Sequence, residues 1–299
     1  MSLLLPASLP AIDILASEGI HLSVSQPSER PLRVALLNLM PTKVATETDF
    51  ARVLSETPLP VEIVLMRLRS HTPRHVSPEH MDSFYRFFDE LRHEYFDGLI
   101  VTGAPLEQID FSQVTYWNEL REVFDWARAT MRSTLYICWA AQAGLFHHFG
   151  IPKYLLPKKM FGIFPQQIMS PDEPLFIGFD HSFLMPHSRH AEVHRADILA
   201  DRRLLLLADG AESGVSVIMA RGGREVFFTG HSEYNALTLD SEFRRDLSRN
   251  LPIEPPRHYY PADDSSQPPL TEWIAHSRRL FNNWLAYYVN SPLLSPLRS

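Results

Sequence analysis

Four apolar runs of the chain are separated by segments with helical periodicity. The runs span residues 33–40, 61–68, 97–104 and 134–138, and aliphatic, often β-branched, side chains dominate them. Uninterrupted apolar runs of this length are typical of strands buried on both faces of a parallel sheet. The intervening segments 42–56, 78–93 and 116–131 place apolar side chains along one side of a helix. This alternation predicts an α/β fold with a doubly wound, mostly parallel sheet and right-handed crossovers.

The rest of the chain is less regular. Residues 150–200 predict loops and short strands at one edge of the sheet, and two later strands are expected at 213–220 and 225–231, joined by a hairpin turn. Helices are predicted at 238–250 and 270–289, the second one packing on the core as a C-terminal helix. Residues 1–30 are interrupted by prolines and predict an N-terminal arm, whereas residues 31–299 are expected to form a single domain.

Composition narrows the class of protein. The 299 residues are 45% hydrophobic and include one cysteine, which excludes an intramolecular disulfide and suits a reducing compartment. The chain starts without a basic segment and has no apolar run of about 18 residues, so neither a signal peptide nor a membrane span is expected. A net charge of -7 argues against a general nucleic-acid surface. These features predict a soluble cytoplasmic protein.

The single cysteine ends the fourth apolar run. Residues 134–137 read as a strand, and a segment of small, helix-favouring residues follows Cys138 at once. A thiol at such a bend stands at the carboxyl end of a strand, where the N-terminus of the next helix favours a thiolate and later an oxyanion. The alternative is that Cys138 is a small buried apolar residue, as most free cysteines are.

A second segment with chemical content follows the strand predicted at 225–231. His231 comes directly after Gly230, and Glu233 lies two residues further on, where side chains of an extended backbone point the same way. A carboxylate beside an imidazole orients the ring and supports its charged form, and the imidazole can then deprotonate a thiol. The sequence therefore predicts a Cys138–His231–Glu233 triad at the carboxyl edge of the sheet.

These motifs resemble a known family. The bend at Cys138 with the downstream His-x-Glu is similar to the flavodoxin-like, class I glutamine amidotransferase fold. More narrowly, the chain resembles the homoserine O-acyltransferases of methionine biosynthesis, which include homoserine O-succinyltransferases and O-acetyltransferases. The resemblance extends over about residues 30 to 290, and the matching segments are 37–41, 98–105, 138–143, 150–153, 183–189, 229–234, 245–246 and 283–289.

The resemblance implies a ping-pong acyl transfer. Cys138 would carry the acyl group as a thioester, His231 would act as general base, and Glu233 would support His231. Backbone N–H groups near Gly103 and Trp139 are expected to hold the oxyanion. Further residues match family positions that contact the amino acid or lie close to the active site: Lys159, Ser188 and Arg245, which would bind L-homoserine, and Lys43, which would lie near the thiol. No cofactor is expected besides the co-substrate acetyl-CoA, and the resemblance also implies a homodimer.

Glu107 occupies the position that distinguishes the two branches of this family. Succinyl-specific members resemble this loop with glycine there, whereas acetyl-specific members carry glutamate. A carboxylate at this position would repel the distal carboxylate of a succinyl group and would fill its space, yet it would tolerate acetyl. The resemblance therefore implies acetyl-CoA as donor, with succinyl-CoA as the alternative if Glu107 points to solvent.

Several alternatives remain open at this stage. Ser232 and His190 replace a proline and a tyrosine that are common in the family, so serine stays an alternative acceptor to homoserine. A glutamine amidotransferase-type hydrolase would flank its cysteine with glycines, and a non-catalytic binding module would show no special thiol reactivity. The histidine groups lack the spacing of known zinc motifs, so no metal is expected; they are His71/His75, His147/His148 and His187/His190/His194. No dinucleotide or phosphate-loop motif is present.

Overall fold

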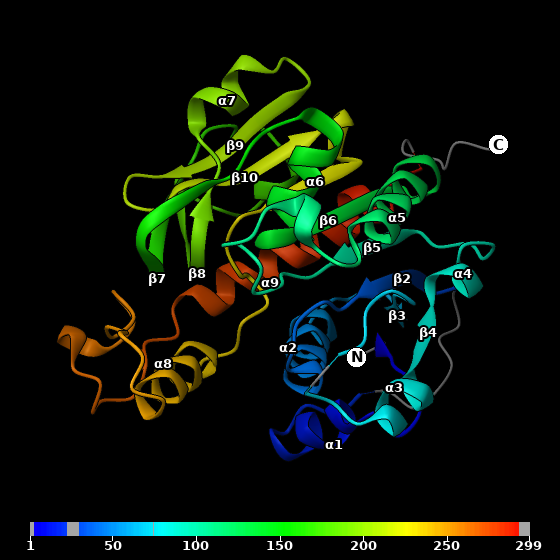
Figure 1. Cartoon of the computed structure of the whole chain (residues 1–299), viewed down its shortest axis with the longest axis horizontal. Helices are drawn as coiled ribbons and strands as arrows, with labels where there is room; N and C mark the ends of the chain where they lie inside the picture. Colours follow the sequence, from blue (N-terminus) through cyan, green and yellow to red (C-terminus); the bar gives the residue numbers. More distant parts are fainter. Residues whose placement is uncertain (1–2, 23–29, 74, 293–299) are drawn as a thin grey trace.

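The strands predicted from the apolar runs lie together in the middle of the molecule. The computed structural model describes residues 3–22, 30–73 and 75–292. In it, five parallel strands take the order β3–β2–β5–β6–β11 (Figure 1). Every residue of β5, β6 and β11 is buried, which explains why their sequences do not alternate with polar residues. The strands are β2 (Leu32–Leu37), β3 (Val61–Arg67), β5 (Gly98–Val101), β6 (Ser133–Ile137) and β11 (Glu225–Phe228).

Helices cover both faces of these strands. Leu135 and Ile137 of β6 belong to one core cluster, whereas Tyr136 between them belongs to another, as the alternation of a strand requires. The first cluster includes side chains of α1 (Pro10–Ser17), α2 (Lys43–Ser55) and α9 (Trp273–Trp284). The second includes side chains of α5 (Trp117–Thr130) and α6 (Trp139–Phe149). The result is a three-layer α/β arrangement, which confirms the predicted fold class.

Beyond β11 the sheet continues with antiparallel strands. The order is β11–β10–β9–β7–β8, and these strands form one side of the molecule in Figure 1. The hairpin of β10 (Gly214–Ala220) with β11 confirms the prediction, and β9 (Leu204–Gly210) follows the short helix α7 (Arg195–Ala200). The prediction of short strands in 150–200 is wrong, because β7 (Tyr154–Ile168) and β8 (Ser182–Glu192) form a long ribbon. Much of β7 is partly exposed, so its sequence lacks a continuous apolar run.

The single helix predicted at 78–93 is also wrong. The segment forms α3 (Pro78–Phe84), a three-residue strand β4 (Tyr85–Phe87) and α4 (Phe88–Leu91). β4 pairs in parallel with the end of β3, and Tyr85 donates a hydrogen bond to Glu47 Oε1 at 2.5 Å. These tertiary contacts override the helical periodicity of the segment.

The N-terminal arm is part of the same sheet. β1 (Leu3–Leu4) pairs with β3, and Ala11 and Leu15 of α1 are buried against the core; residues 1–2 and 23–29 of the predicted arm lie outside the described residues. At the other end, α8 (Thr238–Ser248) precedes a long loop, and α9 continues into a π-helical turn over Leu285–Val289. Within the described ranges, every helix is too short or too polar to cross a bilayer.

Candidate active site

Cys138 lies at a strained bend between β6 and α6. Its φ of 53° and ψ of -115° are unusual for a residue with a side chain, and its side chain is buried. The Cys138 N–H donates to the carbonyl of Phe228 at 2.7 Å, so the bend is tied to the neighbouring strand β11. The residue is the N-cap of α6, whose helix dipole favours negative charge on the sulfur. The predicted strand–bend–helix geometry is confirmed.

His231 and Glu233 follow β11, the strand next to β6. The register pairs Phe228 with Ile137, so the two chains leave the sheet at the same edge. The backbone N–H of His231 donates to Pro186 O at 2.8 Å, which places the residue against β8. Its Nδ1 lies 2.7 Å from Glu233 Oε1, and both side chains are buried. The imidazole is thereby held in one orientation by a carboxylate.

The charge state of His231 depends on its two partners. Burial lowers its pKa, but the charges of Cys138 and Glu233, and hydrogen bonds with both, outweigh burial and raise the pKa well above its usual value. The ring of Tyr234 stacks on the imidazole at 4.1 Å, with 13° between the planes. An imidazolium beside a thiolate is the state that a nucleophilic cysteine needs.

Gly103 lies directly against Cys138 and His231. A Cβ on this residue would lie 3.3 Å from Cys138 Cβ and 3.4 Å from His231 Cε1, closer than side chains normally pack. The turn after β5 is held by Thr102, whose N–H donates to Leu37 O at 3.1 Å. Trp139, the first residue of α6, is fully buried. Gly103 and Trp139 thus flank the thiol, as predicted; their role as oxyanion donors stays a prediction.

Glu107 is buried rather than directed to solvent, with 7% of its surface exposed. Burial raises the pKa of its carboxyl, and the charges of His190 and His231 act in the opposite direction. The loop that carries it is held by Lys153, whose Nζ donates to the carbonyls of Glu107 and Ile109. Glu107, the predicted specificity residue, is therefore close enough to His231 to interact with its charge.

The three predicted amino-acid ligands converge on a residue that the sequence did not single out. Glu242 of α8 accepts from Lys159 Nζ at 2.6 Å and from Ser188 Oγ at 2.9 and 3.0 Å. Arg245 Nη2 lies 3.7 Å from the same carboxylate, one turn along the helix. The spacing of Glu242 and Arg245 by three residues on a predicted helix is a signal that could have pointed to Glu242. Such a set of opposite charges is suited to a zwitterionic ligand.

Arg189 is a buried cation that the sequence patterns did not indicate. Arg189 is fully buried, and its guanidinium donates to the carbonyls of Ala191, at 2.7 Å, and Ser213. Burial lowers the pKa of Arg189, whereas the charges of Cys138 and Glu107 raise it. The positive charge of Arg189 therefore interacts with the charges of Cys138, Glu192 and Glu107. Its polar contacts depend on the β7–β8 ribbon, which the sequence did not predict.

Lys43 lies at the start of α2, near the carboxyl end of β2. Its Nζ donates to Asn38 O at 2.5 Å, and the side chain is buried. Burial lowers its pKa to about 8, against the opposing charge of Glu47. His71 interacts with the charge of Lys43, and burial is the main reason that the pKa of His71 falls to about 4. A role for Lys43 beside the thiol stays a prediction.

His187, His190 and His194 each have a different neighbour in the fold. His187 is buried beside Gln166, His190 interacts with Glu107, and His194 stacks on Tyr154. In the described part of the chain, one group that could hold a metal ion is Asp125 with His147 and His148, whose ligand atoms lie within 4.8 Å of one another. These residues belong to α5 and α6, whereas the triad lies at the edge where β6 and β11 end. The catalytic geometry described above uses none of them.

Comparisons with known proteins agree with this geometry. A family model described as homoserine O-succinyltransferase matches residues 2–293. Homoserine O-acetyltransferase from Bacteroides fragilis (strain YCH46) is 55% identical over 293 residues, which cover 97% of this chain and 96% of that protein. Homoserine O-acetyltransferase from Brevibacillus brevis is 50% identical, with the same coverage of both chains.

Solved structures show the same fold at much lower identity. A glutamine amidotransferase from Thermotoga maritima is 13% identical, with a TM-score of 0.54, covering 88% of this chain and 100% of that chain. A glutamine amidotransferase from Methylobacillus flagellatus is 12% identical, also with a TM-score of 0.54, covering 88% and 95%. The sequence matches extend over nearly the whole chain, whereas these structures support the fold alone. The chain belongs to the homoserine O-succinyltransferase family and has a class I glutamine amidotransferase-like fold.

Proposed function

We propose that this chain transfers the acetyl group of acetyl-CoA to the hydroxyl of L-homoserine, which makes it a homoserine O-acetyltransferase. The observation that carries the proposal is the buried triad, in which Glu233 lies 2.7 Å from His231 and His231 makes a hydrogen bond with Cys138. The names of the relatives at 50–55% identity support homoserine as acceptor and acetyl as the transferred group. O-acetylhomoserine would then serve methionine biosynthesis.

The first half of the reaction forms a thioester. His231 holds the proton of the Cys138 thiol, and the thiolate attacks the carbonyl carbon of acetyl-CoA. The developing oxyanion would lie between Trp139 and the turn at Gly103. The bond to the sulfur of coenzyme A breaks, and His231 gives its proton to the departing thiolate. The acetyl group remains on Cys138.

The second half uses the cluster around Glu242. The carboxylate of Glu242 would bind the ammonium of homoserine, while Arg245 and Lys159 would bind its carboxylate. His231 takes the proton of the homoserine hydroxyl as this oxygen attacks the thioester carbon. The C–S bond breaks, the ester leaves, and the Cys138 thiolate is restored. Atoms and protons balance without a cofactor or a metal ion.

Glu107 is the reason to favour acetyl over succinyl. The family model carries the succinyl name, whereas the relatives cited above carry the acetyl name, so family membership alone leaves the donor open. Glu107 is buried and interacts with the charge of His231, so a carboxylate lies near the reacting acyl group. A second carboxylate on a succinyl chain would be repelled by the ionised form and would compete for its space.

Other activities follow from the same site with less support. A glutamine hydrolase would share the triad, but Ile137 and Trp139 flank Cys138 where glycines are expected. Serine is one methylene shorter than homoserine and would bring its hydroxyl less close to the thioester. A binding module would need neither the strained Cys138 nor the raised pKa of His231. A cytoplasmic location and a homodimer also belong to this proposal.

A matrix of two donors and two acceptors tests the proposal. Acetyl-CoA and succinyl-CoA are each combined with homoserine and serine, and release of free coenzyme A is followed. We expect the highest kcat/KM for acetyl-CoA with homoserine. Incubation with acetyl-CoA alone should add ~42 Da to Cys138, as expected for acetylation of a covalent nucleophile. Absence of the adduct, or a preference for another pair of substrates, would reject the mechanism or the substrates respectively.

A further inference from the structure

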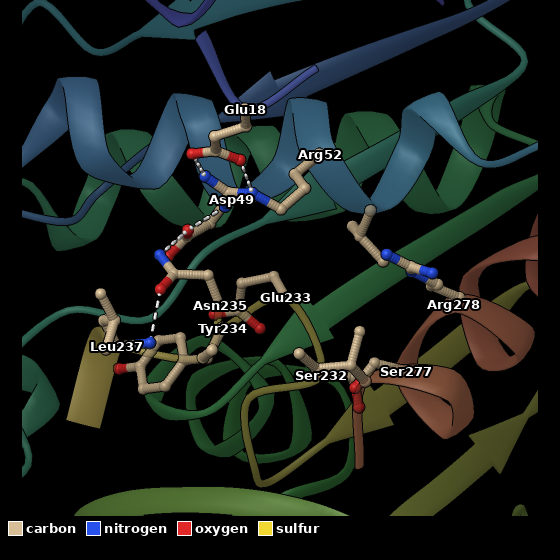
Figure 2. A pocket seen from close by; sticks show the side chains of 13 residues that line it. Glu18, Asp49, Arg52, Ser232, Glu233, Tyr234, Asn235, Leu237, Ser277 and Arg278 are labelled. Atoms are coloured by element: carbon tan, nitrogen blue, oxygen red, sulfur yellow. Dashed lines mark hydrogen bonds and ion pairs between the residues drawn. The ribbon is translucent and has the colours of Figure 1, made fainter. Parts of the chain in front are cut away.

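The loop that carries His231 and Glu233 is anchored to a helix from the N-terminal third of the chain. Asp49 of α2 accepts a hydrogen bond from Asn235 Nδ2 at 2.6 Å (Figure 2). It accepts another from Thr238 Oγ1 at 3.2 Å. Both donors lie in the segment directly after Glu233. One buried carboxylate therefore accepts two hydrogen bonds from the triad loop.

Asp49 is itself held in place by an ion pair. Arg52 Nη1 lies 2.8 Å from Asp49 Oδ1, three residues along α2. The other side of the same guanidinium makes two bonds to Glu18, from Nε at 2.8 Å and from Nη2 at 2.7 Å. Glu18 is the C-cap of α1, so the arm contributes to the network. Figure 2 shows these residues in a continuous line from Glu18 through Arg52 and Asp49 to Asn235.

Packing does not hold the loop on this side. A cavity of about 370 Å³ lies beside it and is lined by Asp49, Arg52 and residues 232–237, with Arg278 of α9 contributing to its wall. Side chains that border a cavity lose the contacts that close packing would supply. On the cavity side, the polar links from Asn235 and Thr238 to Asp49 connect the loop to α2.

We propose that Asp49 is a positioning residue of the triad, whose ionised carboxylate, fixed by Arg52, holds the loop after β11 so that Glu233 orients His231 toward Cys138. The inference rests on the proposed acyl transfer, and it gives Asp49 no contact with either substrate. The charge of Glu233 acts against the ionised form of Asp49, and the positive charge of Arg52 favours it.

The same network makes the triad sensitive to pH. Burial raises the pKa of Asp49 to about 6, although the hydrogen bond from Asn235 and the charge of Arg52 act in the opposite direction. The charged groups that surround Asp49 are Arg52 on its own helix, Glu18 from α1, Glu233 from the loop and Arg278 across the cavity. Protonation would remove the charge that pairs with Arg52, so the alignment of the loop should change as the pH falls through about 6. Because burial raises this pKa, protonation itself does not destabilise the folded loop.

Alkylation of Cys138 by iodoacetamide reports on the triad without any substrate. In the Asp49→Asn variant we expect slower alkylation and a kcat that is about tenfold lower, with KM values nearly unchanged, because a misplaced base costs rate rather than binding. The acid limb near pH 6 in the wild-type alkylation profile should disappear in this variant. Asp89→Asn is the matched control: this exposed aspartate also pairs with an arginine, Arg69, at 2.8 Å, but it lies outside the network.

A change on the loop side of the link separates positioning from general destabilisation. Asn235→Ala removes the hydrogen bond to Asp49 but keeps the Asp49–Arg52 ion pair, and it should slow alkylation in the same way. A folded Asp49→Asn variant with wild-type alkylation and kcat would overturn the proposal, as would an Asn235→Ala variant with wild-type alkylation. If Asp49→Asn does not fold, Arg52→Gln decides, because it removes the positive charge that pairs with Asp49; unchanged alkylation in that variant would overturn the proposal.

The design also distinguishes this proposal from the proposed function. If the wild-type protein transfers no acyl group but its Cys138 alkylation still depends on Asp49, the acyltransferase proposal fails and the positioning role stands. If the wild-type protein transfers the acyl group and alkylation is independent of Asp49, the acyltransferase proposal stands and the positioning role of Asp49 fails.

Discussion

Replacing Glu107 with glycine tests the donor preference most directly. Two carboxylates about 5 Å apart repel each other by about 3 kcal/mol at the effective dielectric of a partly solvated site. Burial raises the pKa of Glu107, so its carboxyl holds its proton to a higher pH than a free glutamate does, which reduces the average repulsion. We therefore expect a penalty of about 1 to 2 kcal/mol against succinyl-CoA, which is about tenfold to thirtyfold in kcat/KM.

The assay measures kcat/KM for both donors, with homoserine as acceptor, by release of free coenzyme A. Glu107→Gly removes charge and bulk, so the ratio of succinyl to acetyl activity should rise by at least the factor above. Glu107→Gln keeps the shape and removes only the charge, and it should give an intermediate ratio. If Glu107→Gly keeps the wild-type ratio while the variant remains folded, specificity is set elsewhere and the reasoning is refuted.

The pH dependence supplies an independent check on the same residue. A carboxyl whose pKa is raised is ionised only above that raised value. Discrimination against succinyl-CoA should therefore be strongest at high pH and should weaken as the pH falls through the pKa of Glu107. The Glu107→Gln variant has no such group, and its ratio of the two donors should not change in this way. A wild-type ratio that is independent of pH would favour a purely steric role.

Three further substitutions test the remaining parts of the site. Cys138→Ala should abolish transfer and the ~42 Da adduct in mass spectrometry; full activity would exclude the covalent scheme. Gly103→Ala places a methyl group 3.3 Å from Cys138 Cβ, and kcat should fall about tenfold with little change in KM. An unchanged kcat would mean that the backbone around residue 103 shifts to accommodate the methyl group without disturbing Cys138. Glu242→Gln should raise the KM for homoserine about tenfold but leave acetylation of Cys138 unchanged; slower acetylation instead would place Glu242 in the first half of the reaction.

The triad could be predicted because each part follows a readable strand. The apolar runs that become β6 and β11 end at Cys138 and just before His231, and parallel neighbours in a sheet bring their carboxyl ends to one edge. Glu233 needed only local geometry, since its position two residues after His231 places the two side chains together. Local pattern and strand direction were sufficient for these three residues.

Other elements could not be read in this way. The helix predicted at 78–93 is interrupted by β4, because Tyr85 and its neighbours pair with β3 and contact Glu47, far away in the sequence. Glu242 could not be singled out because its hydrogen-bond donors, Lys159 and Ser188, lie on the β7–β8 ribbon. The strands of this ribbon are partly exposed, so their sequences show only a weak strand pattern.

The sequence by itself determined the layered α/β fold and the placement of Cys138, His231 and Glu233 at one edge of the sheet, because these depend on periodicity and on contacts between neighbours in the chain. Only the tertiary structure decided what surrounds them. The charge of Arg189 interacts with that of Cys138, and Glu107 is buried and interacts with the charge of His231. Asp49 links the triad loop to Glu18 in the N-terminal arm through Arg52. The physical reason is that the burial of a site and the charges around it come from segments that are far apart in the chain. A local sequence pattern does not indicate which of these segments fold together.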